Sequence, residues 1–177
     1  MRTSMLAAVM ITLLSACATD IPDQSDNRPS AVPFGTFEAY VLSPLVVQHM
    51  EGDSGDQAAV KRIDGELRSC MIGALSRLKA IGQTDPSHGK TILIEPSIID
   101  LKKVNVSERF WLGPLAGSSA VLLRVKYTDT ASSKVIAEPT FYAKANSWGG
   151  AFTVGGTDNK MLTRIVNDAC GYTSRNF

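Results

Sequence analysis

The sequence of 177 residues predicts an α+β domain with the order strand, helix, three-stranded antiparallel meander, helix. Apolar residues recur every three or four positions over residues 57–81 and again over 159–170, which is the period of an amphipathic helix. Residues 119–145 instead alternate between apolar and polar, the period of strands with one solvated face. Because such a sheet and two such helices each bury one face, both helices are expected to pack on the same face of the sheet.

The first strand is predicted where Phe37, Ala39 and Val41 alternate with their neighbours. Ser43 and Pro44 end this strand, and residues 45–50 are expected to continue it after the break.

The first helix is predicted over residues 57–81, with Asp56 capping its start and Gly82 closing its end. Gly65 inside it costs about 1 kcal/mol relative to Ala, so we expect Gly65 to mark close packing against the sheet. The apolar stripe of this helix consists of Val60, Ile63, Leu67, Cys70, Met71, Ala74, Leu78 and Ile81.

The meander is predicted from three strands over residues 91–101, 119–128 and 135–145. Pro96 cannot donate a ladder hydrogen bond, which places the middle of the first of these strands at a sheet edge or a bulge.

The last helix is predicted over residues 159–170, with Asp158 as its cap and Gly171 as its stop. Its apolar stripe consists of Met161, Leu162, Ile165, Val166, Ala169 and Cys170.

The first 17 residues have the order of a secretory signal: a basic start, an apolar run over residues 5–14, and small residues before Cys17. An apolar run of this length is too short to cross a bilayer, which takes about 20 residues. The sequence Leu-Ser-Ala-Cys at positions 14–17 resembles the lipobox of bacterial lipoproteins. The resemblance implies that residues 1–16 are a signal peptide and that Cys17 is lipidated, and Ala18 in place of Asp implies the periplasmic face of the outer membrane.

Residues 17–34 are expected to form the lipidated cysteine and a flexible tether, because they are rich in Asp and Pro and have no apolar period. Residues 35–177 are then a single periplasmic α+β domain, a length that suits one core.

Lipidation of Cys17 leaves Cys70 and Cys170 as an even pair in an oxidising compartment, which favours a disulfide. The alternative is that both are small apolar side chains buried in the core.

The net charge of +1 shows no basic excess of the kind that a nucleic-acid-binding protein uses, so nucleic acid is not an expected partner. His49 and His88 fall in predicted loops and have no second ligand at metal-binding spacing. The usual hydrolase, metalloprotease and redox motifs do not occur, and residues 113–118 lack the spacing and the Lys of a phosphate-binding loop. We therefore expect no enzyme, no cofactor and no metal.

Both tryptophans fall in Gly-rich segments that follow predicted strands, and the two segments should leave the sheet at the same end. If exposed, they form a binding surface; the alternative is that they fold back and cap the core. The candidate residues of this surface are Phe110, Trp111, Leu112, Trp148 and Phe152.

From Thr36 onward the order of elements is similar to that of the TolB amino-terminal domain and the curli-secretion lipoprotein. More closely, residues 91–96, 113–119 and 157–159 resemble a family of bacterial lipoproteins of unknown function, although residues 129–134 depart from its Thr-Gly turn. The resemblance carries over no catalytic residue.

These observations predict a non-catalytic, lipid-anchored lipoprotein of the cell envelope that acts as a protein-binding or assembly module. Its partners are the membrane, through the anchor, and an envelope protein or a second copy of the chain. The alternative is a module that binds a small molecule or a cell-wall glycan through the same tryptophans.

Overall fold

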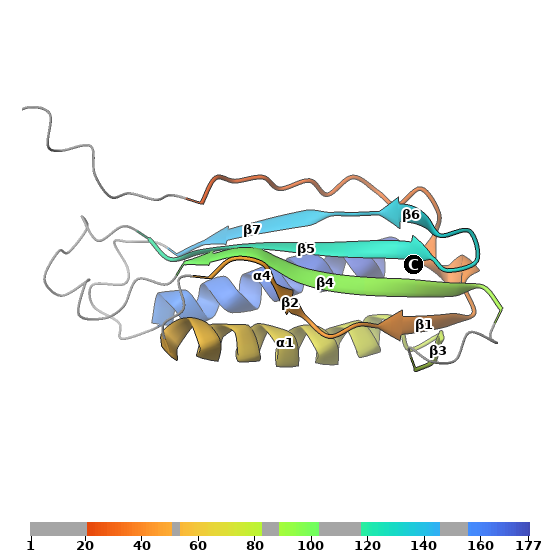
Figure 1. The fold of residues 1–177 in the computed structure, drawn as a ribbon, viewed down its shortest axis with the longest axis horizontal. Helices are drawn as coiled ribbons and strands as arrows, with labels where there is room; N and C mark the ends of the chain where they lie inside the picture. The colour runs from red at the N-terminus through yellow and green to blue at the C-terminus, as the bar shows by residue number, and fades with distance from the viewer. Residues whose placement is uncertain (1–20, 51–53, 83–88, 103–117, 146–155) are drawn as a thin grey trace, which may run out of the picture.

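A seven-stranded mixed sheet carries two long helices, α1 (Ser54–Ala74) and α4 (Gly156–Arg175), which lie side by side on one of its faces (Figure 1). The computed structural model describes residues 21–50, 54–82, 89–102, 118–145 and 156–177. The predicted α+β class is confirmed.

The sheet has the order β3-β1-β4-β5-β6, with β2 paired to β4 and β7 paired to β5. β1 and β2 run parallel to β4, whereas β4 with β5, and β5 with β6 and β7, are antiparallel. The sheet is therefore not a simple antiparallel meander, because the first strand pairs parallel with β4. Parallel strands need a long connection between them, and α1 lies in that connection. The strands are β1 (Ala39–Leu42), β2 (Val46–Val47), β3 (Lys79–Ala80), β4 (Thr91–Lys102), β5 (Ala120–Asp129), β6 (Lys134–Ala137) and β7 (Thr140–Lys144).

Pro96 lies in the central strand β4, opposite Val125 of β5, so the predicted edge position is wrong. β1 pairs with β4 as far as Ile94, and β2 pairs with it from Ser97. Pro96 thus faces the break between β1 and β2, where its missing N–H costs no ladder hydrogen bond. The bulge of β4 lies further on, between Ile98 and Asp100.

The first helix ends at Ala74 and not at residue 81 as predicted, so Gly82 is not its C-cap. Residues 79–80 form β3 instead, because the N–H of Lys79 donates to the carbonyl of Glu38 at 2.9 Å and pairs this stretch with β1. α1 also begins at Ser54, which places Asp56 in its first turn and not at the cap position. The predicted close packing at Gly65 is wrong too, since an added Cβ there would meet nothing within 4 Å.

The last helix continues through Gly171, its predicted stop, and begins at Gly156, before its predicted cap Asp158. Beyond Gly171, the side chains of Tyr172 and Thr173 are buried in the core. Burial of an aromatic side chain outweighs the roughly 1 kcal/mol that a helical glycine costs.

The core lies between the sheet and the two helices. At one end of it the rings of Phe34 and Tyr127 stack at 4.6 Å, and the Tyr127 hydroxyl shares a 2.7 Å hydrogen bond with the hydroxyl of Thr173. Burial raises the pKa of Tyr127 far above its ordinary value. Phe34 is fully buried, so the domain includes residues before the predicted boundary at 35.

Candidate functional site

Residues 21–33 form a docked segment, which lies along β7 and β6 (Figure 1). Asp26 and Thr140 exchange two backbone hydrogen bonds of 3.0 and 2.9 Å, and the N–H of Ala31 donates to the carbonyl of Ile136 at 3.0 Å. The prediction of a flexible tether is therefore wrong for this part of residues 17–34. The segment covers the sheet edge that β7 and β6 would otherwise leave open.

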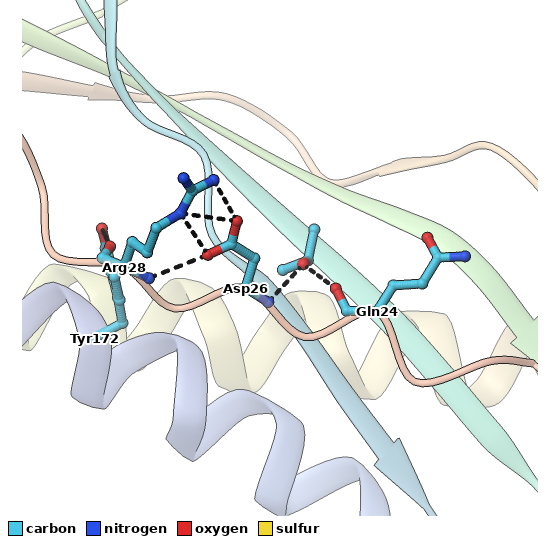
Figure 2. A network of polar contacts seen from close by, with 5 residues as sticks. Gln24, Asp26, Arg28 and Tyr172 are labelled. Carbon is cyan, nitrogen blue, oxygen red and sulfur yellow. Dashed lines mark hydrogen bonds and ion pairs between the residues drawn. The ribbon is translucent and has the colours of Figure 1, made fainter.

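Side chains fasten the docked segment to α4 and β7 (Figure 2). The Tyr172 hydroxyl donates a 2.8 Å hydrogen bond to the carbonyl of Arg28, and the Thr140 hydroxyl donates to the carbonyl of Gln24. The Arg28 guanidinium also donates to Asp26 and holds the pKa of that carboxyl below its usual value. That ion pair is exposed and contributes little stability, so the backbone contacts and Tyr172 hold the segment.

The last residues of the chain complete this attachment. Asn176 accepts two hydrogen bonds of 2.7 Å, from the N–H of Ser30 to its side-chain oxygen and from the N–H of Phe34 to its carbonyl. The two ends of the folded domain are thus joined directly.

At its other end, the docked segment begins with Ile21, which is 6% exposed. Ile21 packs on Ala120 and Leu122, with Ile99 and Tyr142 beside them, in a small apolar cluster separate from the main core. Ile99 faces this cluster by the alternation of β4, since Ile98 faces the core, and the bulge that follows returns Leu101 to the core side.

Ile21 lies near the end of the sheet where several strands stop. The register places Lys102, the last residue of β4, beside Ala120, the first of β5, and Ala120 beside Lys144, the last of β7. The segments 103–117 and 146–155 therefore both depart from this end. The candidate residues Phe110, Trp111, Leu112, Trp148 and Phe152 lie in them, outside the described residues.

Four cations gather at the same end, which we call the basic end and define by Lys102, Lys144, Lys160 and Arg164. Both helices begin there, as Figure 1 shows. The Arg164 guanidinium donates a 2.7 Å hydrogen bond to the carbonyl of Lys144 and so ties the first turns of α4 to the end of β7.

A fifth cation joins α1 to the basic end. Arg62 of α1 donates to the side chains of Asn159 at 2.6 Å and Thr163 at 3.0 Å, both in α4, and to Glu66 in its own helix at 2.7 Å. An open depression of about 540 Å³ lies over this contact. It is lined by Arg62, Asn159, Lys160, Thr163, Arg164, Asn167 and Asp168.

Cys70 and Cys170 form a disulfide between α1 and α4, with their Cα atoms 6.1 Å apart. Both residues are only partly exposed and pack against the core, so the bridge lies at the seam of the two helices. Cys17, the predicted lipidation site, lies outside the described residues.

The remaining predictions concern histidines and metals. His49 is exposed, and His88 lies outside the described residues. Within the five described ranges, no three His, Cys, Asp or Glu side chains are grouped so that they could hold a metal ion. Neither long helix, over the part of the chain that the structure describes, is apolar enough to span a membrane.

Comparison with protein-family models gives no match to this sequence, and comparison with curated protein sequences gives none either. Among solved structures, the PelC dodecamer from Paraburkholderia phytofirmans is 10% identical with a TM-score of 0.49, and the match covers 82% of this chain and 93% of that one. XCC0632 from Xanthomonas campestris, of the DUF330 family, is 12% identical with a TM-score of 0.41, covering 84% and 93%.

Lipoprotein GNA1162 from Neisseria meningitidis is also similar, at 8% identity and a TM-score of 0.39, covering 75% of this chain and 96% of that one. The expected likeness to TolB and the curli-secretion lipoprotein is not shown. All three TM-scores lie below 0.5, so these similarities carry no conclusion about function.

Proposed function

We propose that this chain is a non-catalytic, lipid-anchored lipoprotein of the bacterial cell envelope that binds a protein partner through the segments containing Trp111 and Trp148. The observation that carries the proposal is the register of Lys102, Ala120 and Lys144, because it makes both segments depart from one end of the sheet. Two tryptophans that share one end can form one contact surface, and aromatic anchors supply much of the binding energy in protein interfaces.

The anchor is the lipidated Cys17, on the periplasmic face of the outer membrane. The disulfide between Cys70 and Cys170 supports this location, because disulfides persist in oxidising compartments such as the periplasm and are rare in the cytosol. The partner is an envelope protein or a second copy of the chain.

Affinity purification of the full-length protein from crosslinked envelopes tests the proposal. We expect a specific partner, or a crosslinked homo-oligomer, with the native chain and its loss in the Trp111→Ala, Trp148→Ala double variant. The matched control is Val46→Ala, Val135→Ala, which trims two exposed apolar side chains elsewhere on the sheet and should leave the partner bound. Partner recovery that is equal in both double variants would contradict the proposed surface.

A Cys17→Ser variant tests the anchor separately. Mass spectrometry of the purified native protein should show a chain that begins at residue 17 and carries acyl groups, and the variant should lose the acyl groups and fractionate away from the membrane. A native protein without acyl groups would contradict the anchor and leave the partner surface to be judged on its own.

A further inference from the structure

The distance between the anchor and the folded domain is short. Ile21 is already buried against the domain, only four residues after Cys17, and four residues of extended chain span at most about 14 Å. The 12 residues of β4 extend over roughly 36 Å, so the domain is much longer than this spacer. If Cys17 is lipidated, the end of the domain near Ile21 is therefore held at the membrane surface.

The charge at that end complements a phospholipid surface. Lys144, Lys160 and Arg164 are exposed and Lys102 is half-buried, all at the end of the sheet beside Ile21. α1 and α4 both begin there as well, which adds the positive ends of two helix dipoles. Each Lys or Arg close to an anionic membrane favours contact by about fivefold, so the exposed cations of this end, although partly offset by Asp168 beside Arg164, favour one orientation of a domain that is already tethered.

The side of the domain along the docked segment has no comparable positive charge. Asp26 pairs there with Arg28 and Glu138 pairs with Arg124, while Asp23 is exposed beside them. Hydrogen bonds from Ser25 hold the pKa of Asp23 below its usual value, and those from Arg28 do the same for Asp26. Both carboxyls are therefore ionised at neutral pH, and since Arg28 balances Asp26, this side offers no net attraction to an anionic surface.

We propose that the basic end docks on the phospholipid headgroups of the membrane that holds the lipid of Cys17, with the long axis of the sheet pointing away from the bilayer. This inference rests on the proposed lipid anchor. It also places the partner of the tryptophan segments, which depart from the same end, in or on that membrane.

Fluorescence quenching on vesicles tests the orientation. The full-length lipidated protein is reconstituted into vesicles of phosphatidylethanolamine and phosphatidylglycerol that contain a headgroup quencher. A fluorophore is attached to one introduced cysteine at a time: Asn159→Cys at the basic end, Ala131→Cys in the turn at the opposite end, or Ala31→Cys on the docked segment. We expect quenching at Asn159 to exceed that at Ala131 severalfold, with Ala31 between them.

Charge reversal tests whether the cations of the basic end cause this orientation. Lys160→Glu should reduce quenching at Asn159 about twofold or more, whereas Lys134→Glu, which reverses an exposed lysine at the opposite end, should not. Salt at 1 M should act like Lys160→Glu, because it screens charges beyond about 3 Å. Vesicles of phosphatidylethanolamine and phosphatidylcholine alone should abolish the difference between the two variants.

The outcomes separate the two proposals. Protein that does not float with the vesicles contradicts both the anchor and the docking. Protein that floats but shows equal quenching at the three positions, or the strongest quenching at Ala31, overturns the docking and leaves the anchor standing. Lys160→Glu and Lys134→Glu with equal effects would overturn the role of the basic end.

Discussion

The hydroxyl of Tyr172, near the end of the last helix, donates a hydrogen bond to the backbone carbonyl of Arg28, 144 residues earlier in the chain. We expect Tyr172→Phe to keep the buried ring and to lower the free energy of unfolding by about 1 kcal/mol, the usual contribution of one hydrogen bond. Chemical denaturation of both proteins measures the difference.

Arg28→Ala is the control for that substitution, since it removes the exposed side chain and keeps the carbonyl. The guanidinium is largely exposed, and an exposed ion pair contributes little, so the loss of stability should be clearly smaller than that of Tyr172→Phe. Equal losses in the two variants would show that the side chain of Arg28, and not its carbonyl, holds the segment.

Reduction of the disulfide should destabilise the domain strongly. Cys70 and Cys170 are separated by 100 residues, and a loop of that length contributes about 4 to 5 kcal/mol in the chain-entropy description. We expect dithiothreitol to lower the unfolding midpoint of the native protein. The Cys70→Ala, Cys170→Ala double variant should have a low midpoint that does not respond to the reductant, and a response there would contradict the assignment.

Gly65→Ala should stabilise the protein. Gly65 lies inside α1, is exposed, and has open space where a Cβ would be added. The greater helix propensity of Ala should therefore raise the free energy of unfolding by about 1 kcal/mol. Gly35→Ala is the opposite case, because its Cβ would lie 2.8 Å from the carbonyl oxygen of Phe177. Thermal unfolding should therefore shift upward for the first variant and downward for the second.

High pH should unfold the domain through Tyr127. The pKa of Tyr127 in the folded protein is raised above the unfolded value of about 10. The contribution of the neutral phenol to stability is therefore complete below pH 10 and is lost progressively as the pH rises above 10. The decline from this group approaches about 1.4 kcal/mol per pH unit. Tyr127→Phe should lower stability at pH 7 but give a shallower decline above pH 10, and parallel declines would contradict this account.

Docking of residues 21–33 should appear in amide hydrogen exchange. The amides of Asp26 and Ala31 donate within the domain, so both should exchange more slowly than a free chain. Ile21→Asp buries a charge in the small apolar cluster and should raise exchange at Asp26 more than at Ala31. Fast exchange at both amides in the native protein would contradict the docking and support a flexible tether over these residues.

The periodic elements were predictable from the sequence. The strands at 91–102 and 120–129 differ from their predicted bounds by one residue, because alternation over ten residues leaves few other arrangements. The end of α1 was not predictable, since Leu75 and Leu78 stay buried after the helix ends and extend its apolar period. What ends the helix is a backbone pairing with β1, which no side-chain pattern records.

The docked segment was missed for a related reason. Residues 22–31 are polar and rich in Asp and Pro, and they attach mainly through backbone hydrogen bonds and one apolar residue, Ile21. Composition predicts disorder for such a stretch, and only the neighbouring β7 and β6 provide the partners that order it. The pairing of Cys70 with Cys170 was accessible, because both belong to apolar stripes of helices expected on one face.

The two hydrogen bonds that Asn176 accepts from Ser30 and Phe34 have a consequence for the order of folding. Because synthesis runs from the amino terminus, residues 21–33 are made long before Asn176. The carboxyl end of the docked segment can therefore form its bonds to Asn176 only after almost the whole chain has been made. Closure of the domain by its own last residues is thus a late step of folding.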